Sequence, residues 1–243
     1  MSVPNAPAST LTWEGLGSLF PEFPGASRWL SLLERHAELI ASARSRVRVT
    51  SVRDEDIVRR HYAESLEILR IAGELGWGGV VCDVGSGGGY PGMVFAAVIP
   101  DTEVHLVEPL QKRARLLEWM AQELGLANIR VHAERGEEAG RGPLRDSCGL
   151  VTARAVAELR ELLEYTAPLA AEGGLLAIPK GSALESELAA SSGAMQALSI
   201  GEERRVAMRD EISEHVEVLS FRKRGVTPAA YPRRPGVPGK RPL

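Results

Sequence analysis

The strongest constraint on the fold of this chain is a glycine-rich turn between an apolar strand and an apolar helix. Residues 83–92 read Asp-Val-Gly-Ser-Gly-Gly-Gly-Tyr-Pro-Gly and directly follow an apolar run. Glycines at such a junction let the backbone turn sharply and approach a ligand closely. A plain turn would not need near-consecutive glycines, because glycine loses more conformational entropy on folding than any other residue. The turn therefore predicts a ligand site at the carboxyl end of a strand.

Short apolar runs and amphipathic stretches alternate along the chain after residue 79. Strands are predicted over residues 80–84, 103–107, 129–132, 150–154, 174–178, 204–208 and 215–221. Helices are predicted over residues 91–98, 111–124, 158–170 and 184–190. This alternation requires a mostly parallel sheet with helices on both faces, and the last two strands are close enough to pair antiparallel.

The first part of the chain lacks this alternation. Residues 1–25 are rich in Pro, Gly, Ser and Ala and are predicted to be irregular. Apolar residues then recur every three or four positions from Ala26 to Ala43, which predicts a helix there. A second helix is predicted from an N-cap at Asp54 to about Leu75. The predicted organisation is an irregular N-terminus (1–25), a helical extension (26–76), one α/β domain (77–222) and a basic tail (223–243).

Composition excludes several classes of protein. The 243 residues are 44% hydrophobic and 25% charged, which suits a globular domain. No apolar run reaches the ~18 residues that span a bilayer, and residues 1–10 do not resemble a secretory signal. Cys82 and Cys148 are expected to be buried, reduced thiols, and the scattered Cys and His predict no zinc site. We expect a cytoplasmic protein without membrane contact, and we favour a monomer.

The charge of the chain is distributed unevenly. The formal net charge is −3, but residues 222–243 carry seven basic and no acidic side chains, which leaves −10 for residues 1–221. An acidic body with a basic tail suggests a polyanionic partner met at one edge. A solvated, disordered terminus would explain the same pattern, and charge alone does not choose between the two.

Two acids near the glycine turn bear on the ligand. Gly85, Gly87 and Gly89 alternate, whereas the dinucleotide fingerprint places its last glycine three residues after the second. Asp83 precedes the first glycine, where it would disfavour a phosphate and suit a ligand with an ammonium group. Glu108, at the end of the second strand, can accept both hydroxyls of a ribose in either kind of ligand. Together these residues favour S-adenosylmethionine over a nicotinamide cofactor.

Further polar residues lie at carboxyl ends of the predicted strands, where ligands bind in such sheets. Gly136 and Glu137 follow the third strand and either line the adenine or belong to a solvated loop. Arg154 ends the fourth strand, as an ion-pair partner or a ligand residue. Lys180 ends the fifth, where a substrate must approach.

Four segments together resemble the RsmG family, also called the glucose-inhibited division protein B family, of bacterial 16S ribosomal RNA guanine-N7 methyltransferases. They are residues 50–65, 83–92, 154–157 with 180–181, and 231–243. The Gly-Tyr-Pro-Gly ending of the turn and the Pro/Arg-rich tail are the most specific. The likeness covers about residues 28–243.

The resemblance implies a class I S-adenosylmethionine-dependent methyltransferase fold, which is Rossmann-like with a mostly parallel seven-stranded sheet. The implied cofactor-binding residues are Asp83, Gly85, Gly87, Gly89, Tyr90, Glu108, Gly136, Glu137 and Arg154. The implied RNA-binding residues are Arg48, Arg53, His61, Lys180, Arg233, Arg234 and Lys240. Arg154 and Lys180 are the residues expected to act in catalysis. The family modifies guanine 527 in the 530 loop of 16S ribosomal RNA, so the implied partner is that RNA or the small ribosomal subunit.

The chain departs from the family pattern at several positions. Arg48 stands where the family often has Asn, which puts the placing of the target base in doubt; Ala153 replaces a Ser, and Glu108 an Asp. Guanine N7 carries a free lone pair, so we expect catalysis by positioning and no general base. Three rival functions are a small-molecule methyltransferase, a nicotinamide oxidoreductase and a non-enzymatic RNA-binding protein. The basic tail argues against the first, and cofactor binding would exclude the other two.

Overall fold

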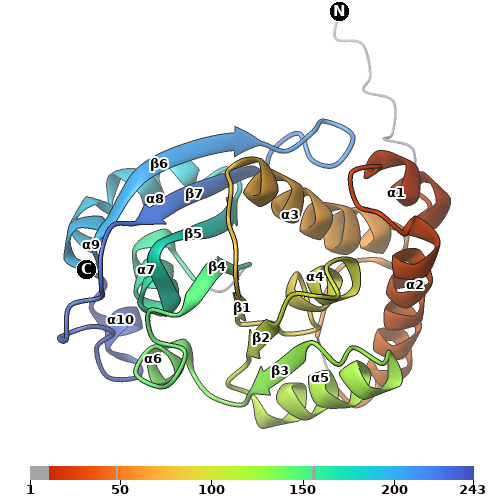
Figure 1. The fold of residues 1–243 in the computed structure, drawn as a ribbon, viewed down its shortest axis with the longest axis horizontal. Helices are drawn as coiled ribbons and strands as arrows, with labels where there is room; N and C mark the ends of the chain where they lie inside the picture. Colours follow the sequence, from red (N-terminus) through yellow and green to blue (C-terminus); the bar gives the residue numbers. More distant parts are fainter. Residues whose placement is uncertain (1–10, 48, 155–156) are drawn as a thin grey trace, which may run out of the picture.

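The computed structural model describes residues 11–47, 49–154 and 157–243, and Arg48 lies outside them. Its centre is a seven-stranded sheet of order β3-β2-β1-β4-β5-β7-β6 (Figure 1). The strands are β1 (Val81–Val84), β2 (Val104–Val107), β3 (Ile129–His132), β4 (Cys148–Ala153), β5 (Ala170–Lys180), β6 (Ile200–Ala207) and β7 (Glu217–Lys223). Strands β1 to β5 pair in parallel, and β7 runs antiparallel to both β5 and β6. The predicted mostly parallel sheet and its antiparallel final pair are confirmed.

Helices cover both faces of the sheet, as predicted. One face carries α1 (Trp13–Leu19), α2 (Ala26–Ala43), α3 (Glu64–Glu74), α4 (Gly92–Val98) and α5 (Gln111–Glu123). The other face carries α6 (Gly136–Ala139), α7 (Leu159–Thr166), α8 (Leu184–Ala189) and α9 (Ser192–Ala197). In strand β1 the side chain of Val81 packs on the first face and those of Cys82 and Val84 on the second. This alternation divides the buried apolar residues into two clusters.

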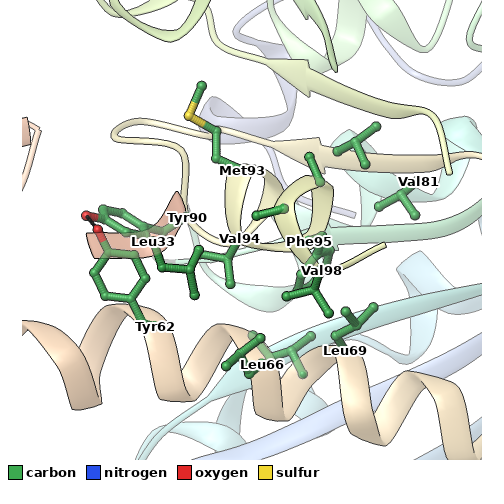
Figure 2. Close-up of a cluster of buried hydrophobic side chains, with 14 of the residues drawn as sticks. Leu33, Tyr62, Leu66, Leu69, Val81, Tyr90, Met93, Val94, Phe95 and Val98 are labelled. Atoms are coloured by element: carbon green, nitrogen blue, oxygen red, sulfur yellow. Dashed lines mark hydrogen bonds between the residues drawn. The ribbon is translucent and has the colours of Figure 1, made fainter. Parts of the chain in front are cut away.

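The helical extension shares its core with the sheet. Figure 2 shows Leu33 of α2 and Leu66 and Leu69 of α3 gathered around α4, whose side chains are all buried. The extension therefore has an apolar face that is satisfied only by the α/β part of the chain. Because the two share one cluster, the extension can place its polar residues accurately beside the glycine turn.

Two details at the N-terminal side differ from the sequence prediction. Helix α1 lies in the segment expected to be irregular; the Thr12 hydroxyl accepts a hydrogen bond from the Gly15 N–H, and Leu16 and Phe20 are fully buried. Capping and burial outweigh the composition of this segment. The predicted N-cap at Asp54 is wrong by one residue, because Arg53 occupies that position and its side chain makes no capping hydrogen bond.

The second predicted helix is divided into three parts. A 3-10 turn (Asp54–Asp56) leads into a π-helix (Val58–Ala63), which continues as α3. The wider turn of a π-helix shifts the side-chain phase, and π-helical turns are frequent at functional sites. Here the consecutive residues His61, Tyr62 and Ala63 are all buried. No periodicity in the sequence predicts this change of helix type.

The C-terminal tail folds back onto the second face and includes a short helix, α10 (Val237–Lys240). Figure 1 shows it beside α6 and α7. Arg145 donates to the carbonyls of Thr227 and Tyr231, and Arg141 donates to that of Pro232. A solvated, disordered tail is therefore not what the structure shows. Cys82 and Cys148 are free and buried, as expected. No helix in the described ranges is long and apolar enough to cross a bilayer.

Candidate active site

The glycine turn between β1 and α4 uses the conformational freedom that its sequence provides. Gly85, Gly87 and Gly89 have φ angles of 76°, 55° and 92°, in the region that other residues rarely adopt. The intervening residues keep negative φ angles, so the alternation in sequence corresponds to an alternation in backbone conformation. Gly92 is required for a different reason: a Cβ there would lie 2.2 Å from Leu106 Cδ2. The turn is therefore pressed tightly against strand β2.

A pocket of about 380 Å³ opens beside this turn. One wall is formed by Gly85–Gly88 and Tyr90, and the opposite wall by the loop Val49–Val52. The remaining lining side chains are all ionisable: Arg60, His61, Glu64, Arg113 and Arg154. The pocket lies at the carboxyl ends of β1 and β4, which is where ligands bind in this class of sheet.

Glu108 sits where a ribose acceptor was predicted. It follows β2, it is 2% exposed, and its Oε2 accepts from the Gly87 N–H at 2.9 Å. Its Oε1 accepts from the Leu110 N–H at 2.9 Å. The two backbone bonds fix the carboxylate and leave each oxygen a further lone pair. A diol beside the glycine turn would find both oxygens held in place.

Asp83 lies beneath the turn and does not line the pocket. Its carboxyl is fully buried; Oδ2 accepts from the Gly92 N–H at 3.0 Å, while Oδ1 has no hydrogen-bond partner among the described residues. Burial raises its pKa to about 6. An orphaned carboxylate oxygen next to a ligand turn is compatible with a cationic ligand group, so the donor set suits S-adenosylmethionine. The predicted ammonium contact of Asp83 remains a prediction.

A directed chain of hydrogen bonds supports the turn from the helical extension. His36 Nε2 lies 3.0 Å from the Gly88 carbonyl, which can only accept, so this nitrogen is the donor. Burial lowers the pKa of His36 to about 4, so the ring is neutral and its Nδ1 accepts from the Tyr62 hydroxyl at 3.0 Å. Tyr62 then accepts from the Tyr90 hydroxyl at 3.1 Å. Figure 2 shows the two tyrosine hydroxyls meeting.

A second polar cluster joins β4 to the π-helix. Arg154 donates to the Arg60 carbonyl at 2.6 Å, to Glu64 Oε2 at 3.2 Å and to His61 Nδ1 at 2.8 Å. The same guanidinium lies 5.6 Å from the centre of the Tyr90 ring, on which His61 stacks at 4.2 Å. Arg154 is thus an ion-pair partner that also lines the pocket, and its contact with a ligand remains a prediction.

The tautomer of His61 follows from these contacts. Because Arg154 can only donate, His61 Nδ1 accepts and Nε2 carries the proton. Burial, reinforced by the charge of Arg154, lowers the pKa of His61 to about 3, so the ring is neutral. Its Nε2–H therefore donates to Thr50 Oγ1 at 2.6 Å, which also accepts from the Val52 N–H. The Thr50 hydroxyl proton is left without an acceptor among the described residues and can donate into the pocket.

Gly136 and Glu137 begin α6, outside the lining of this pocket. Glu137 is buried, and its Oε1 accepts from the Gly236 N–H of the tail at 2.9 Å. A Cβ on Gly136 would lie 3.2 Å from both Val84 and Tyr165. The loop is therefore packed between β1, α7 and the tail, and the reading as a solvated loop is wrong. The adenine contact remains a prediction.

The predicted RNA-binding residues that the structure describes make different contacts. Lys180 donates to Glu187 Oε2 at 2.6 Å and to the Ala157 carbonyl at 2.9 Å, so it ties the segment after β4 to α8. Arg53 is exposed and pairs with Glu55 and Asp56. His61 lines the pocket. Their contacts with RNA remain predictions.

The tail residues differ among themselves. Arg233 binds the fully buried carboxylate of Glu164 through its backbone N–H and its guanidinium, at 2.8 and 2.9 Å for Oε1, and this pairing raises the pKa of Arg233. In this structure Arg233 attaches the tail to α7, and its contact with RNA remains a prediction. Arg234 and Lys240 are exposed.

Sequence reasoning missed several residues that organise the site. Thr50 entered only as part of a family motif, His36 only as one position of an apolar helix face, and Tyr62 and Glu64 not at all. The one signal that could have drawn attention to His36 is that it is a polar residue at a position on the apolar face of a predicted helix. Nothing in the sequence shows that these side chains meet, since 26 residues separate His36 from Tyr62.

Comparison with known proteins agrees with this architecture. Residues 30–216 match the model of the family described as GidB, rRNA small subunit methyltransferase G. Ribosomal RNA small subunit methyltransferase G of Symbiobacterium thermophilum is 39% identical over 95% of this chain and 96% of its own length. That of Desulfitobacterium hafniense is 34% identical over 86% of this chain and 87% of its own.

Solved structures support the fold. A variant of MtNAS in complex with S-adenosylmethionine matches with a TM-score of 0.54 and 16% identity, over 88% of this chain and 85% of that one. A SAM dependent methyltransferase from Aquifex aeolicus matches with a TM-score of 0.53 and 15% identity, over 77% of this chain and 98% of that one. At this identity the likeness concerns the fold, which is that of class I methyltransferases.

Proposed function

This chain belongs to the GidB family of rRNA small subunit methyltransferases, and on that premise we propose that it transfers the methyl group of S-adenosylmethionine to N7 of a guanine in 16S ribosomal RNA. Guanine 527 in the 530 loop is the proposed position. The methyl donor would lie across the carboxyl ends of β1 and β2, with its ribose at Glu108 and its methionine end at the glycine turn. The acceptor guanine would enter the pocket between that turn and Val49–Val52.

The observation that carries this proposal is the pocket with its neutral, fully committed histidine. His61 lines the pocket, and its acceptor nitrogen is already occupied by Arg154. The pKa of about 3 leaves it unable to hold a proton at neutral pH. An acceptor atom that must lose a proton would need a free base nearby. Guanine N7 has a lone pair and needs no base, so a neutral His61 that accepts from Arg154 is compatible with methylation there.

Positioning is then the main contribution of the pocket residues. The Thr50 hydroxyl proton can donate to an acceptor on the base, such as O6 of guanine. Methylation at N7 leaves the base cationic, and Glu64 places a buried carboxylate at the pocket wall, where its Oε1 lies 3.2 Å from Arg60 Nε. Oriented groups of this kind stabilise the charge that develops as the methyl group is transferred.

The test is transfer of tritiated methyl from S-adenosylmethionine to 16S RNA, and to small subunits, from a strain that lacks this gene. We expect label at one guanine, located by cleavage specific for N7-methylguanine. Gly85→Asp should abolish transfer, because it places a side chain at a positive φ angle beside the cofactor. Gly125→Asp is the matched control, since Gly125 also has a positive φ angle but lies in open space at the end of α5.

Lys180→Ala tests the predicted catalytic and RNA-binding role of Lys180. We expect reduced transfer with unchanged cofactor affinity. Label at a base position other than N7 would reject the proposed target atom. Cofactor binding without label on any RNA or subunit would reject the ribosomal substrate and favour small-molecule methyl acceptors, the strongest rival function.

A further inference from the structure

A second hollow lies between the C-terminal end of α2 and the outer side of α5. We call it the α2–α5 groove; it measures about 270 Å³. Figure 1 shows the two helices meeting at this corner of the molecule. Its lining residues are Ser42, Ala43, Arg46, Val47, Lys112, Arg115, Leu116 and Trp119. The proposed methyl-transfer chemistry does not use these residues.

Three cations of the groove have no counterion within residues 11–47, 49–154 and 157–243. The side chains of Arg46, Lys112 and Arg115 are exposed and make no ion pair or hydrogen bond with the residues that the structure describes. Most other arginines of this acidic body are paired, for example Arg44 with Asp54. The nearest acid of α5, Glu118, lines a different hollow of the helix. Unpaired cations grouped on an acidic protein indicate a site for an anionic ligand.

An exposed aromatic ring completes the groove. Trp119 is 38% exposed, although large apolar side chains of this chain are mostly buried. Lys112, Arg115 and Trp119 are spaced by three and four residues, so they form one stripe along α5. An aromatic ring beside unpaired cations is the combination that binds single-stranded nucleic acid, since the ring stacks on a base and the cations contact phosphates.

The groove and the proposed methyl-transfer pocket are lined by residues that lie close together in the chain at two places. Lys112 lines the groove and the next residue, Arg113, lines the pocket. Val47 lines the groove and Val49 lines the pocket. This closeness in the chain is the reason to consider the groove as a place for RNA backbone adjacent to a base in the pocket.

We propose that the α2–α5 groove binds the substrate RNA next to the target nucleotide, with an unstacked base on Trp119 and phosphates at Arg46, Lys112 and Arg115. This inference rests on the proposed function and adds a surface to it. It places an RNA contact on the first face of the sheet, whereas the basic tail is attached to the second.

The test compares two double variants that remove the same charge. Lys112→Gln/Arg115→Gln alters the groove, and Arg204→Gln/Arg224→Gln alters exposed arginines at and just after strands β6 and β7, at the opposite edge of the sheet. Methyl transfer to 16S RNA and to small subunits, RNA binding by filter retention at several salt concentrations, and calorimetric binding of S-adenosylmethionine are measured for both. The groove variant should raise the KM for RNA about 10-fold and lower the salt dependence of binding by about 1.5 in log–log slope. Cofactor affinity should not change.

Trp119 is tested separately. Trp119→Ala should weaken RNA binding at least ~5-fold by removing the stacking surface, whereas Trp119→Phe should restore most of it. Equal KM values and salt slopes for the two double variants, with wild-type transfer intact, would overturn the groove proposal and leave the proposed function standing. RNA binding that depends on the groove but is not followed by methyl transfer would overturn the proposed function and leave the groove proposal standing. Absence of RNA binding by the wild type would overturn both.

Discussion

At the scale of single residues, the site depends on side chains that are held by the backbone before any ligand arrives. Glu108 accepts one hydrogen bond from the glycine turn and one from the loop that leads into α5. Its position couples the two segments that would enclose a cofactor. Gly92 plays the complementary part, because the absence of a side chain lets the turn lie directly on β2.

Replacement of Glu108 by Gln is expected to weaken binding of S-adenosylmethionine about 10- to 100-fold. The amide keeps one acceptor but faces a backbone N–H with its own N–H₂ group, and charge-assisted hydrogen bonds contribute about 1.5–3 kcal/mol each. Isothermal titration calorimetry measures the change. Glu103→Gln is the control, since it removes an acid next to the other end of β2. Equal affinities for the two variants would exclude Glu108 from the cofactor site.

Replacement of Gly92 by Ala is expected to destabilise the protein by about 2–3 kcal/mol. The added methyl would overlap Leu106 and lie 2.9 Å from the Asp83 side chain, and overpacking of this kind is costly. Gly125→Ala, at a positive φ angle but in open space, should cost only about 1 kcal/mol. Urea unfolding measures the loss of stability in both variants. A loss for Gly92→Ala that is smaller than predicted would show that the turn can move away from β2.

At the scale of elements, the tail is fixed by one buried ion pair and by hydrogen bonds from α6 and the following loop. Glu164 of α7 is fully buried, yet it accepts from Arg233 at both oxygens. Gly236, three residues after Arg233, donates its backbone N–H to the Glu137 carboxylate of α6. The tail is therefore connected to the loop predicted to meet the adenine.

Arg233→Ala is expected to destabilise the protein by about 3 kcal/mol, because removing one partner leaves the Glu164 charge buried without compensation. Arg234→Ala, which removes an exposed neighbour, should change stability by less than about 0.5 kcal/mol. Chemical unfolding gives the free energies, and limited proteolysis should cut the tail faster in Arg233→Ala alone. Equal stabilities of the two variants would mean that the remaining contacts of the tail hold it in place without the Arg233 side chain.

At the scale of the whole molecule, the buried histidines should set its response to acid. His36 and His61 have pKa values of about 4 and 3 in the folded state, against 6.5 as the ordinary value, so they take up protons on unfolding at pH 4.5–6. Asp83 opposes them, because its folded pKa of about 6 exceeds 3.8 and it releases a proton on unfolding. These three groups together take up about one proton on unfolding, so their combined effect is that stability falls as the pH falls.

We expect the free energy of unfolding to decrease by about 1.4 kcal/mol per pH unit between pH 6 and 4.5. His36→Gln should be less stable at pH 7 but lose little of its remaining stability over this range. His215→Gln, at an exposed position, should keep the wild-type slope. Urea titrations across this range test the expectation; an unchanged slope in His36→Gln would show that His36 is protonated in the native protein.

The sequence by itself determined the features that depend on neighbouring residues. The alternation of strands and helices, the left-handed glycines of the turn, the inward residues of α5 and the position of Glu108 at the end of β2 all follow from local spacing. Periodicity and backbone sterics act over a few residues, so they can be read along the chain.

Only the tertiary structure decided which distant groups meet. The neutral state of His61 depends on its burial and on the charge of Arg154. The placement of the glycine turn depends on His36 and Tyr62, and the attachment of the tail depends on Glu164. The π-helical turn that buries His61 and Tyr62 together has no periodic signature. Burial and charge pairing are properties of groups far apart in sequence, because they arise only when the sheet brings its strand ends to one edge.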